Sequence, residues 1–340
     1  MQNKWWLCHA TNFHSLMYPC FIYCRILGIF PNKLNASTFE ISKSHYVLST
    51  IVIYICCVIN LSLVNNIISK TYLEEIIKNL NFFIFHIFNN LIVIITHILS
   101  RPRMRLLQTI LEISVIIPQK SYQKLSRLIH IKDLLGIIFK HWHLYLFFSK
   151  ILESQITYSV VLLAMIVTYF NLMVFQTNML YINCVCVLKA CFKSVNDTLT
   201  HMQKLVMNDR KSFTYHMQRN QFLPIKLKML KKKHLAVSNA VQMLNKIFSL
   251  QLLATIAIIF FGIIFMLYMY IVNWKDGIYI RFNENFLDLL LSTVAYNIIL
   301  ILLLVWACET SKNQAKEIGI IIHDLLNSTN DEKIKHEVVN

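Results

Sequence analysis

The most restrictive feature of the sequence is the run from Tyr46 to Ile68, which contains no charged side chain. A helix of about 20 apolar residues crosses the hydrocarbon core of a bilayer. Similar apolar runs follow, so that 56% of the 340 residues are hydrophobic and only 15% are charged. Soluble domains carry about 25% charged residues, so this excess of apolar side chains needs lipid as well as a protein interior. The sequence therefore predicts an all-α polytopic membrane protein.

Six transmembrane helices are predicted. Five of them are apolar along most of their length. The third is short and carries Lys140, His141 and His143, so its assignment depends on the topology. The predicted spans are residues 46–68, 82–99, 134–148, 156–175, 250–272 and 286–308, within one transmembrane domain of residues 46–308.

Basic residues, which give a formal net charge of +16, are concentrated in two segments between spans, 101–133 and 200–235. Lys- and Arg-rich loops stay in the cytosol, so both are predicted to be cytosolic loops. They share one side only if the chain crosses the membrane twice between them, which supports the third span. The N-terminal segment 1–45 and the helix extension and tail 309–340 are then cytosolic as well. Basic residues placed between apolar spans indicate contact with anionic membrane lipid, not nucleic acid.

Four Asn-x-Ser/Thr sequons occur in the chain. In the predicted topology each is cytosolic or within a membrane helix, so none is expected to carry a glycan. They begin at Asn35, Asn60, Asn196 and Asn327.

Catalytic and metal-binding patterns are absent from the sequence. His141 and His143 are two residues apart, a spacing that points them to different faces of a helix. Cys184 and Cys186 lie in an apolar run with a spacing that does not suit zinc. We therefore predict no catalytic residue, no metal and no cofactor.

Apolar stripes at helical spacing enter the fifth span and leave the sixth. They predict helices that project beyond the bilayer and pack on another surface. Two alternatives remain open for that surface, namely packing within the chain or an interface between subunits. The subunit-interface candidates are Val241, Leu244, Phe248, Ile318, Ile322 and Leu325.

Several short segments together resemble the insect gustatory (taste) receptors. Residues 25–31 and 39–42 are similar to the family's N-terminal signature, and residues 183–197 to the inner end of its fourth helix. Residues 234–253 resemble the fifth helix. Residues 309–310 and 322–326 resemble the cytosolic end of the sixth helix. The resemblance as a whole runs from about residue 17 to residue 335.

This resemblance implies a seven-helix chemoreceptor with a cytosolic N-terminus. Family members are multi-pass proteins of the plasma membrane of sensory neurons, in dendrite and axon. They form homo- or hetero-tetramers with other gustatory receptor subunits and act as tastant-gated cation channels. The seventh helix lines the pore and carries a signature of Thr-Tyr, several apolar residues and then Gln-Phe, and this signature does not occur before Asn340. The sequence is therefore expected to be either truncated before that helix or not a channel.

A pocket for a small-molecule tastant is expected among the outer halves of the second to sixth spans, because aromatic rings with a few polar groups suit small ligands. Each candidate could instead serve helix packing or a helix start. Alternative functions are an odorant-receptor-like chemoreceptor, a pore-less accessory subunit and a small-molecule transporter. The ligand-binding candidates are His86, Asn89, Asn90, Tyr158, Tyr268, Tyr270, Asp288, Tyr296 and Asn297.

Overall fold

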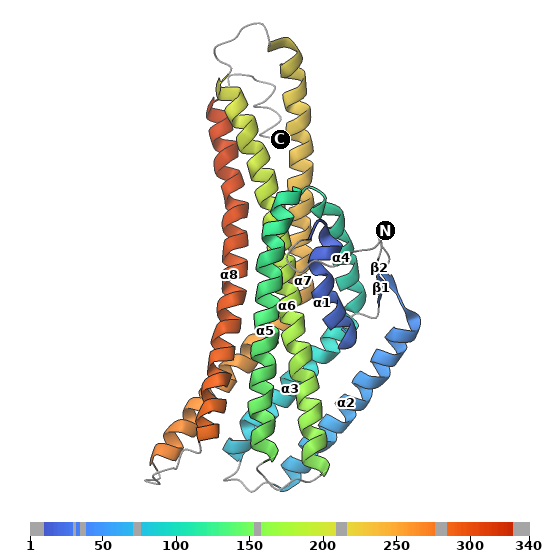
Figure 1. The fold of residues 1–340 in the computed structure, drawn as a ribbon, viewed down its shortest axis with the longest axis vertical. Coiled ribbons are helices and arrows are strands. Elements are labelled where there is room, and N and C mark those ends of the chain that lie inside the picture. Colours follow the sequence, from blue (N-terminus) through green and yellow to red (C-terminus); the bar gives the residue numbers. More distant parts are fainter. Residues whose placement is uncertain are drawn as a thin grey trace.

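The computed structural model describes residues 10–29, 32–34, 39–70, 76–152, 158–208, 216–275 and 284–328. These residues are almost entirely helical, apart from a small antiparallel hairpin in which Lys33 pairs with Glu40. Figure 1 shows a bundle in which the longest helices extend past the others at one end. The elements are α1 (Phe13–Ile26), β1 (Asn32–Leu34), β2 (Phe39–Ile41), α2 (Lys43–Lys70), α3 (Ile76–Ile98), α4 (Ser100–Ser114), α5 (Gln119–Leu152), α6 (Tyr158–Asn208), α7 (His216–Lys275) and α8 (Glu284–Ser328).

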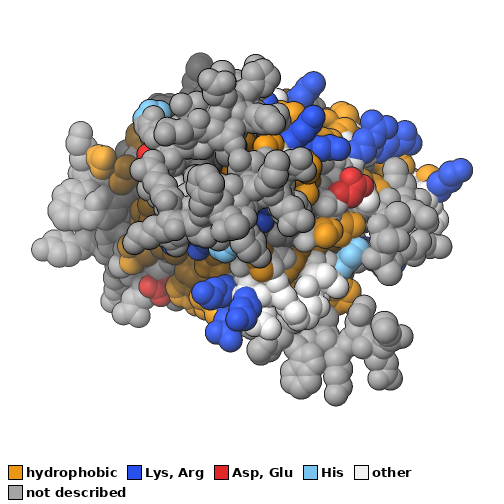
Figure 2. All heavy atoms as spheres, turned by 90° about the horizontal axis from the view of Figure 1, so that it is seen from above, with side chains coloured by type: hydrophobic (Ala, Val, Ile, Leu, Met, Phe, Trp, Pro, Cys, Tyr) orange, Lys and Arg blue, Asp and Glu red, His pale blue; other side chains and the backbone are white. Residues whose placement is uncertain are grey.

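Three helices are more than twice as long as a bilayer requires. α6 has 51 residues, α7 has 60 and α8 has 45, whereas about 20 residues cross the hydrocarbon core. Each is therefore long enough to extend beyond the hydrocarbon core, and projection of the apolar stripes from the bilayer remains a prediction. Figure 2 looks onto the end from which they project and shows groups of Lys and Arg side chains around its edge.

The predicted count of six spans is not confirmed. Within the described residues, four helical stretches are long and apolar enough to cross a membrane: Lys43–Ser62, Val161–Lys204, Leu223–Phe265 and Asp288–Asp324. A fifth is possible if α3 and α4 form one span that bends by 61°. The predicted third span, 134–148, lies inside α5, a continuous helix of 34 residues. It does not meet the same test, because charged and histidine side chains lower its hydropathy.

The two segments predicted to be basic loops are helical where the structure describes them. Residues 101–133 form most of α4 and the first half of α5, and residues 200–235 include the end of α6 and the start of α7. These segments fold as helices because apolar residues recur at helical spacing among the basic ones, and their cytosolic location remains a prediction. In α4, Leu106 and Ile110 are buried while Arg101 and Arg105 are exposed, an amphipathic pattern that folds as helix.

The bend between α3 and α4 is followed by a buried arginine. Arg103 is fully buried, and its Nη2 atom donates a hydrogen bond of 2.5 Å to Oε1 of Gln251 on α7. Its guanidinium carbon also lies 4.7 Å from the centre of the Phe248 ring. These contacts attach α4 to α7 directly after the bend.

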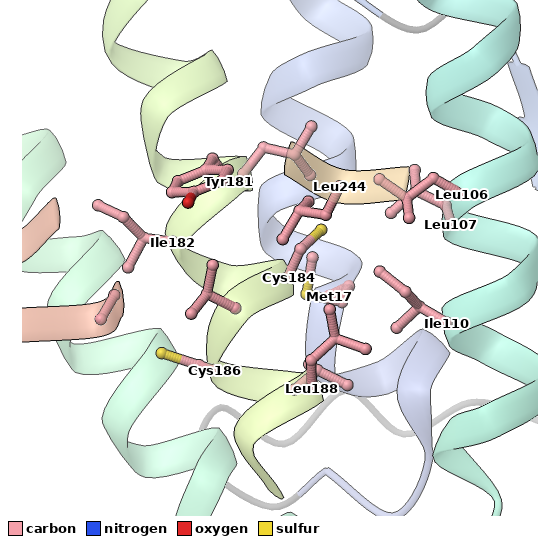
Figure 3. Packing of buried hydrophobic residues seen from close by; sticks show 14 of the residues in the cluster. Met17, Leu106, Leu107, Ile110, Tyr181, Ile182, Cys184, Cys186, Leu188 and Leu244 are labelled. Carbon is pink, nitrogen blue, oxygen red and sulfur yellow. The ribbon is translucent and has the colours of Figure 1, made fainter. Parts of the chain in front are cut away.

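The middle of α6 forms the centre of the core. Every residue from Met173 to Leu188 is buried, including the polar side chains of Gln176, Asn178 and Asn183. Figure 3 shows Cys184 and Cys186 packed among apolar side chains of several helices. The cysteines that the structure describes are free thiols, and these two act there as small apolar groups.

α1 is an integral part of the core, which the prediction of a cytosolic segment 1–45 did not include. Asn12 caps its start through a capping box with Ser15. Gly28, with φ of 72°, ends it, and the Ile29 amide donates to the Cys24 carbonyl at 2.9 Å. This is the glycine-dependent way to close a helix, because other residues rarely adopt positive φ.

Candidate functional site

Aromatic and cationic side chains gather around the Tyr296 ring where α5, α6 and α8 meet. Phe139 of α5 and Phe175 of α6 place their ring centres 6.5 Å and 6.4 Å from that of Tyr296. His143 stacks on the same ring at 5.9 Å with an angle of 2° between planes. Such a group of rings offers a flat apolar surface with polar edges. We call Phe139, Lys140, His143, Phe175, Ser292 and Tyr296 the Tyr296 cluster.

Lys140 supplies the positive charge of the cluster. Its side chain is only 2% exposed, and its Nζ atom lies 4.1 Å from the centre of the Tyr296 ring. Among the ion pairs of the described residues, none involves Lys140. A cation over an aromatic face is attracted by the ring quadrupole, but a ring does not replace a hydrogen-bond acceptor. The ammonium group therefore keeps donors for a ligand.

His143 and Ser292 connect α5 and α8 at the same level. His143 Nδ1 lies 3.1 Å from the Ser292 hydroxyl oxygen. That hydroxyl donates its single hydrogen to the Leu289 carbonyl at 2.9 Å. The histidine nitrogen is therefore the donor in this pair, and its Nε2 atom is then left as an acceptor in the neutral ring.

A groove of about 910 Å³ opens beside the cluster, between α5 and α8. Phe175 and Met179 of α6 form its floor. Gly136 of α5 contributes to the close contact with this floor, because a Cβ atom there would lie 3.1 Å from the Phe175 ring. The lining residues are Arg127, Leu128, Ile131, Lys132, Leu135, Gly136, Ile138, Phe139, Trp142, Phe175, Met179, Tyr296, Ile299, Leu300 and Leu303. Clefts of this size and apolar character hold small molecules.

The predicted ligand residues do not form one site. Of them, Tyr296 alone belongs to the cluster. His86 is buried on α3, where its Nδ1 atom lies 2.5 Å from Oδ1 of Asn60 on α2. Asn89 and Asn90 are buried on the same helix. Asn297 is buried on α8, close to Gly262 of α7, where a Cβ atom would lie 3.7 Å from its Nδ2 atom.

The other candidates lie apart from the groove. Tyr158 is 98% exposed at the start of α6, and Tyr268 of α7 is 38% exposed. Asp288 is exposed in the first turns of α8. The Tyr270 side chain lies outside the described residues. The ligand roles of all nine residues remain predictions.

Sequence reasoning missed Lys140 and His143 as members of the cluster. Both were taken as polar residues that weakened the third span. Their spacing of three residues places them on one face of a helix, and this was the available signal. An ionisable residue within a membrane helix is a functional lead by default.

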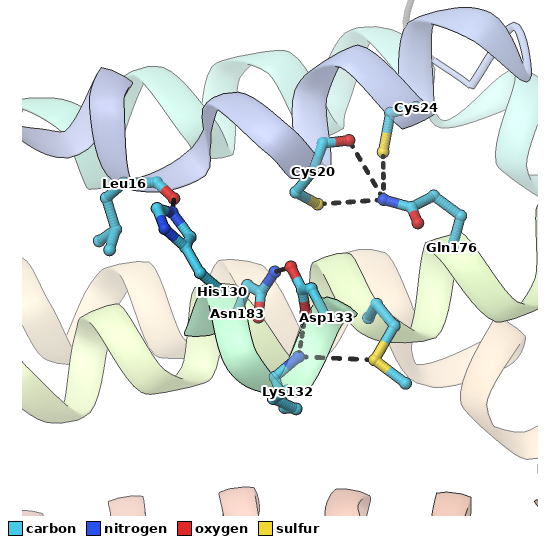
Figure 4. Close-up of polar contacts among 9 residues, drawn as sticks. Leu16, Cys20, Cys24, His130, Lys132, Asp133, Gln176 and Asn183 are labelled. Atoms are coloured by element: carbon cyan, nitrogen blue, oxygen red, sulfur yellow. Dashed lines mark hydrogen bonds and ion pairs between the residues drawn. The ribbon is translucent and has the colours of Figure 1, made fainter. Parts of the chain in front are cut away.

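A second polar cluster lies nearer the basic end of α5 (Figure 4). Lys132 and Asp133 form an ion pair whose side chains are 8% and 9% exposed. Asn183 of α6 donates to Asp133 Oδ2 at 2.8 Å. His130 Nε2 lies 2.9 Å from the Leu16 carbonyl of α1. These contacts satisfy buried polar groups and connect α1, α5 and α6, so we assign the cluster a structural role.

The subunit-interface candidates lie largely within the chain's own packing. Leu244, Phe248 and Ile318 are buried in the core, and Val241 and Ile322 pack at its edge. The Leu325 side chain lies outside the described residues. Packing within the chain accounts for the buried members, and an interface role for the six remains a prediction.

Comparison with known proteins identifies the family. The model of the 7tm chemosensory receptor family matches residues 17–340, and the chain therefore belongs to this family. Its fold is similar to that of the insect olfactory receptor OR5 from Machilis hrabei, with a TM-score of 0.70 and 12% identity over 96% of this chain and 88% of that chain. Comparison with curated protein sequences gives no significant match. The predicted resemblance is thus confirmed for the insect chemosensory receptor family as a whole.

Proposed function

We propose that the chain is a gustatory receptor subunit that detects a small molecule in the Tyr296 cluster. One observation carries the proposal: a buried lysine, which takes part in none of the ion pairs of the described residues, stands over the ring of Tyr296, and that ring lines a large apolar groove. The fitting ligand has a flat or branched apolar body and one hydrogen-bond acceptor. The aromatic rings of the Tyr296 cluster contact the apolar body of the ligand, and Lys140 donates a hydrogen bond to its acceptor.

In this proposal the basic segments face the cytosol, as the positive-inside rule requires. Tyr296 is twelve residues from the start of α8, or about 18 Å along a helix that rises 1.5 Å per residue. The cluster then lies near the middle of the bilayer, and a tastant approaches it from the outer side. The subunit acts in a homo- or hetero-tetrameric cation channel of the plasma membrane of sensory neurons.

Odorant detection is the second candidate, because the structural neighbour is an insect olfactory receptor. A panel of tastants and volatile odorants separates the two functions by ligand-evoked conductance, in cells that express this subunit together with a receptor subunit that carries the seventh helix. We expect responses to non-volatile tastants. Responses confined to volatile odorants would reject taste in favour of smell.

Matched tyrosine variants test the site itself. Tyr296→Ala should abolish the response and Tyr296→Phe should retain most of it, because the ring makes the contacts. Tyr158→Ala is the control, since that side chain is 98% exposed and away from the groove. Unchanged ligand sensitivity in Tyr296→Ala at equal surface expression would exclude this cluster as the binding site.

A further inference from the structure

The part of the α5–α8 groove that runs away from Tyr296 has the dimensions of one membrane leaflet. Its lining on α5 extends from Arg127 to Trp142. The twelve residues from Arg127 to Phe139 span about 18 Å along the helix axis, while half of the hydrocarbon core measures about 15 Å. A small molecule fills only a fraction of this length, whereas an extended acyl chain fills it.

The lining is also apolar where an acyl chain would lie. Ile131 and Leu135 are 52% and 60% exposed along the α5 wall. Ile299 and Leu303 form the α8 wall, and Met179 lies at the floor. None of the described residues that line the groove is acidic. Exposed aliphatic side chains within a bilayer are in contact with lipid, so the groove opens directly to its source of ligand.

Positive charge is confined to one end of the groove. Arg127 and Lys132 line that end, but Lys132 is engaged by Asp133. Arg127 is exposed, and none of the ion pairs of the described residues includes it. Lys124 and Lys120 are exposed one and two turns earlier on α5. A guanidinium group at this position suits a phosphate, which it can bind through two parallel hydrogen bonds.

We propose that this groove binds an anionic glycerophospholipid of the cytoplasmic leaflet. Its phosphate contacts Arg127, and one acyl chain lies between α5 and α8 with its end near Phe139 and Tyr296. The inference rests on the orientation given in the proposed function, since anionic lipids are enriched in the leaflet that faces the basic segments. The end of the lipid tail and the tastant then contact the same aromatic ring, so the lipid regulates the ligand site.

Lipid retention tests the proposal without any tastant, so its outcome is independent of the proposed sensory function. The receptor is purified from vesicles that contain phosphatidylserine and phosphatidylcholine, and the retained lipid is measured by native mass spectrometry. We expect the wild-type receptor to retain phosphatidylserine in preference to phosphatidylcholine. Arg127→Gln should reduce this preference about fivefold, the factor that corresponds to about 1 kcal/mol for one basic residue at an anionic surface.

Arg105→Gln is the matched control, because Arg105 is an exposed arginine on α4 that does not line the groove. It should keep the preference. Leu135→Trp narrows the groove and should lower retention of both lipids, which tests the acyl-chain site separately from the headgroup site. Equal retention of the two lipids by wild type would overturn the proposal, as would an unchanged preference in Arg127→Gln.

Discussion

The Nζ atom of Lys140 on α5 lies 4.1 Å from the centre of the Tyr296 ring on α8, and that ring lines the groove. The two residues are far apart in the sequence, and neither is informative alone. Together they place a cationic donor against an aromatic surface. This pairing defines the chemistry of the ligand that we propose.

Lys140→Met should weaken the response to ligands that carry a carboxylate or carbonyl acceptor. A charge-assisted hydrogen bond contributes about 1.5–3 kcal/mol, so the half-maximal concentration should rise at least about tenfold. The half-maximal concentration for hydrocarbon-like ligands should stay the same as in wild type. Concentration–response curves for both ligand classes measure the effect, with the exposed Lys120→Met as control. An equal shift for both classes would assign Lys140 to packing.

Asp133→Asn should destabilise the receptor strongly. Removal of one partner from a buried ion pair leaves the other charge uncompensated and costs about 3–5 kcal/mol. The double variant Lys132→Met/Asp133→Leu should recover much of the loss. Thermal unfolding followed by size-exclusion fluorescence measures the difference.

The control for this experiment is Lys312→Ala. Its ion pair with Glu309 on α8 has side chains that are 57% and 54% exposed, and such surface pairs contribute little. We expect an unfolding temperature like that of wild type. A similar decrease in Lys312→Ala and Asp133→Asn would show that burial of the charges is not the cause.

Membrane orientation can be tested with an epitope beside Lys211, a residue outside the described part of the chain. Antibody should reach it only after cells are permeabilised, because the neighbouring segment is basic. Glycosidase should leave the electrophoretic mobility of the receptor unchanged, because no sequon is expected to carry a glycan. Asn60 and Asn196 begin two of the four sequons, and their side chains are buried. The Asn196 side chain also donates a hydrogen bond of 2.9 Å to the Gln314 carbonyl. Labelling of intact cells would reverse the orientation.

Neighbouring residues on α8 separate folding from assembly. Ile318 is 4% exposed and Ile320 is 64% exposed. Ile318→Asp should lower the yield of folded protein, because a buried charge costs several kcal/mol. Ile320→Asp should leave folding intact and reduce the oligomer fraction in native mass spectrometry. A wild-type oligomer fraction in Ile320→Asp would show that the exposed face of α8 at Ile320 does not lie in a subunit interface.

The sequence located most helices because an uncharged run of about 20 residues has few alternatives to a membrane span. It failed for helices that are only partly apolar. α1 buries Phe13, Leu16, Met17, Cys20 and Cys24, a spacing that does predict an amphipathic helix. Its short length concealed it among polar neighbours. The end of α6 after residue 200 and the part of α7 before residue 235 were also missed, because their basic residues were taken as evidence of loops.

The functional site was the least predictable part. Tyr296 was a candidate because it lies in an apolar span, but its neighbours come from α5 and α6. Their approach depends on Gly136, which permits close contact with Phe175. Sequence periodicity identifies the face of a helix and not the partner of that face. The pairing of Lys140 with Tyr296 therefore required the three-dimensional structure.

The unbroken helix α6, whose 51 residues extend about 75 Å, can tilt as a rigid body. Its buried middle, packed between α5, α7 and α8, is the point about which it would tilt. A tilt of about 5° displaces each end by ~3 Å, with every hydrogen bond of the helix intact. A ligand that shifts Phe175 by a small angle therefore moves the basic end of the molecule by roughly the width of an atom.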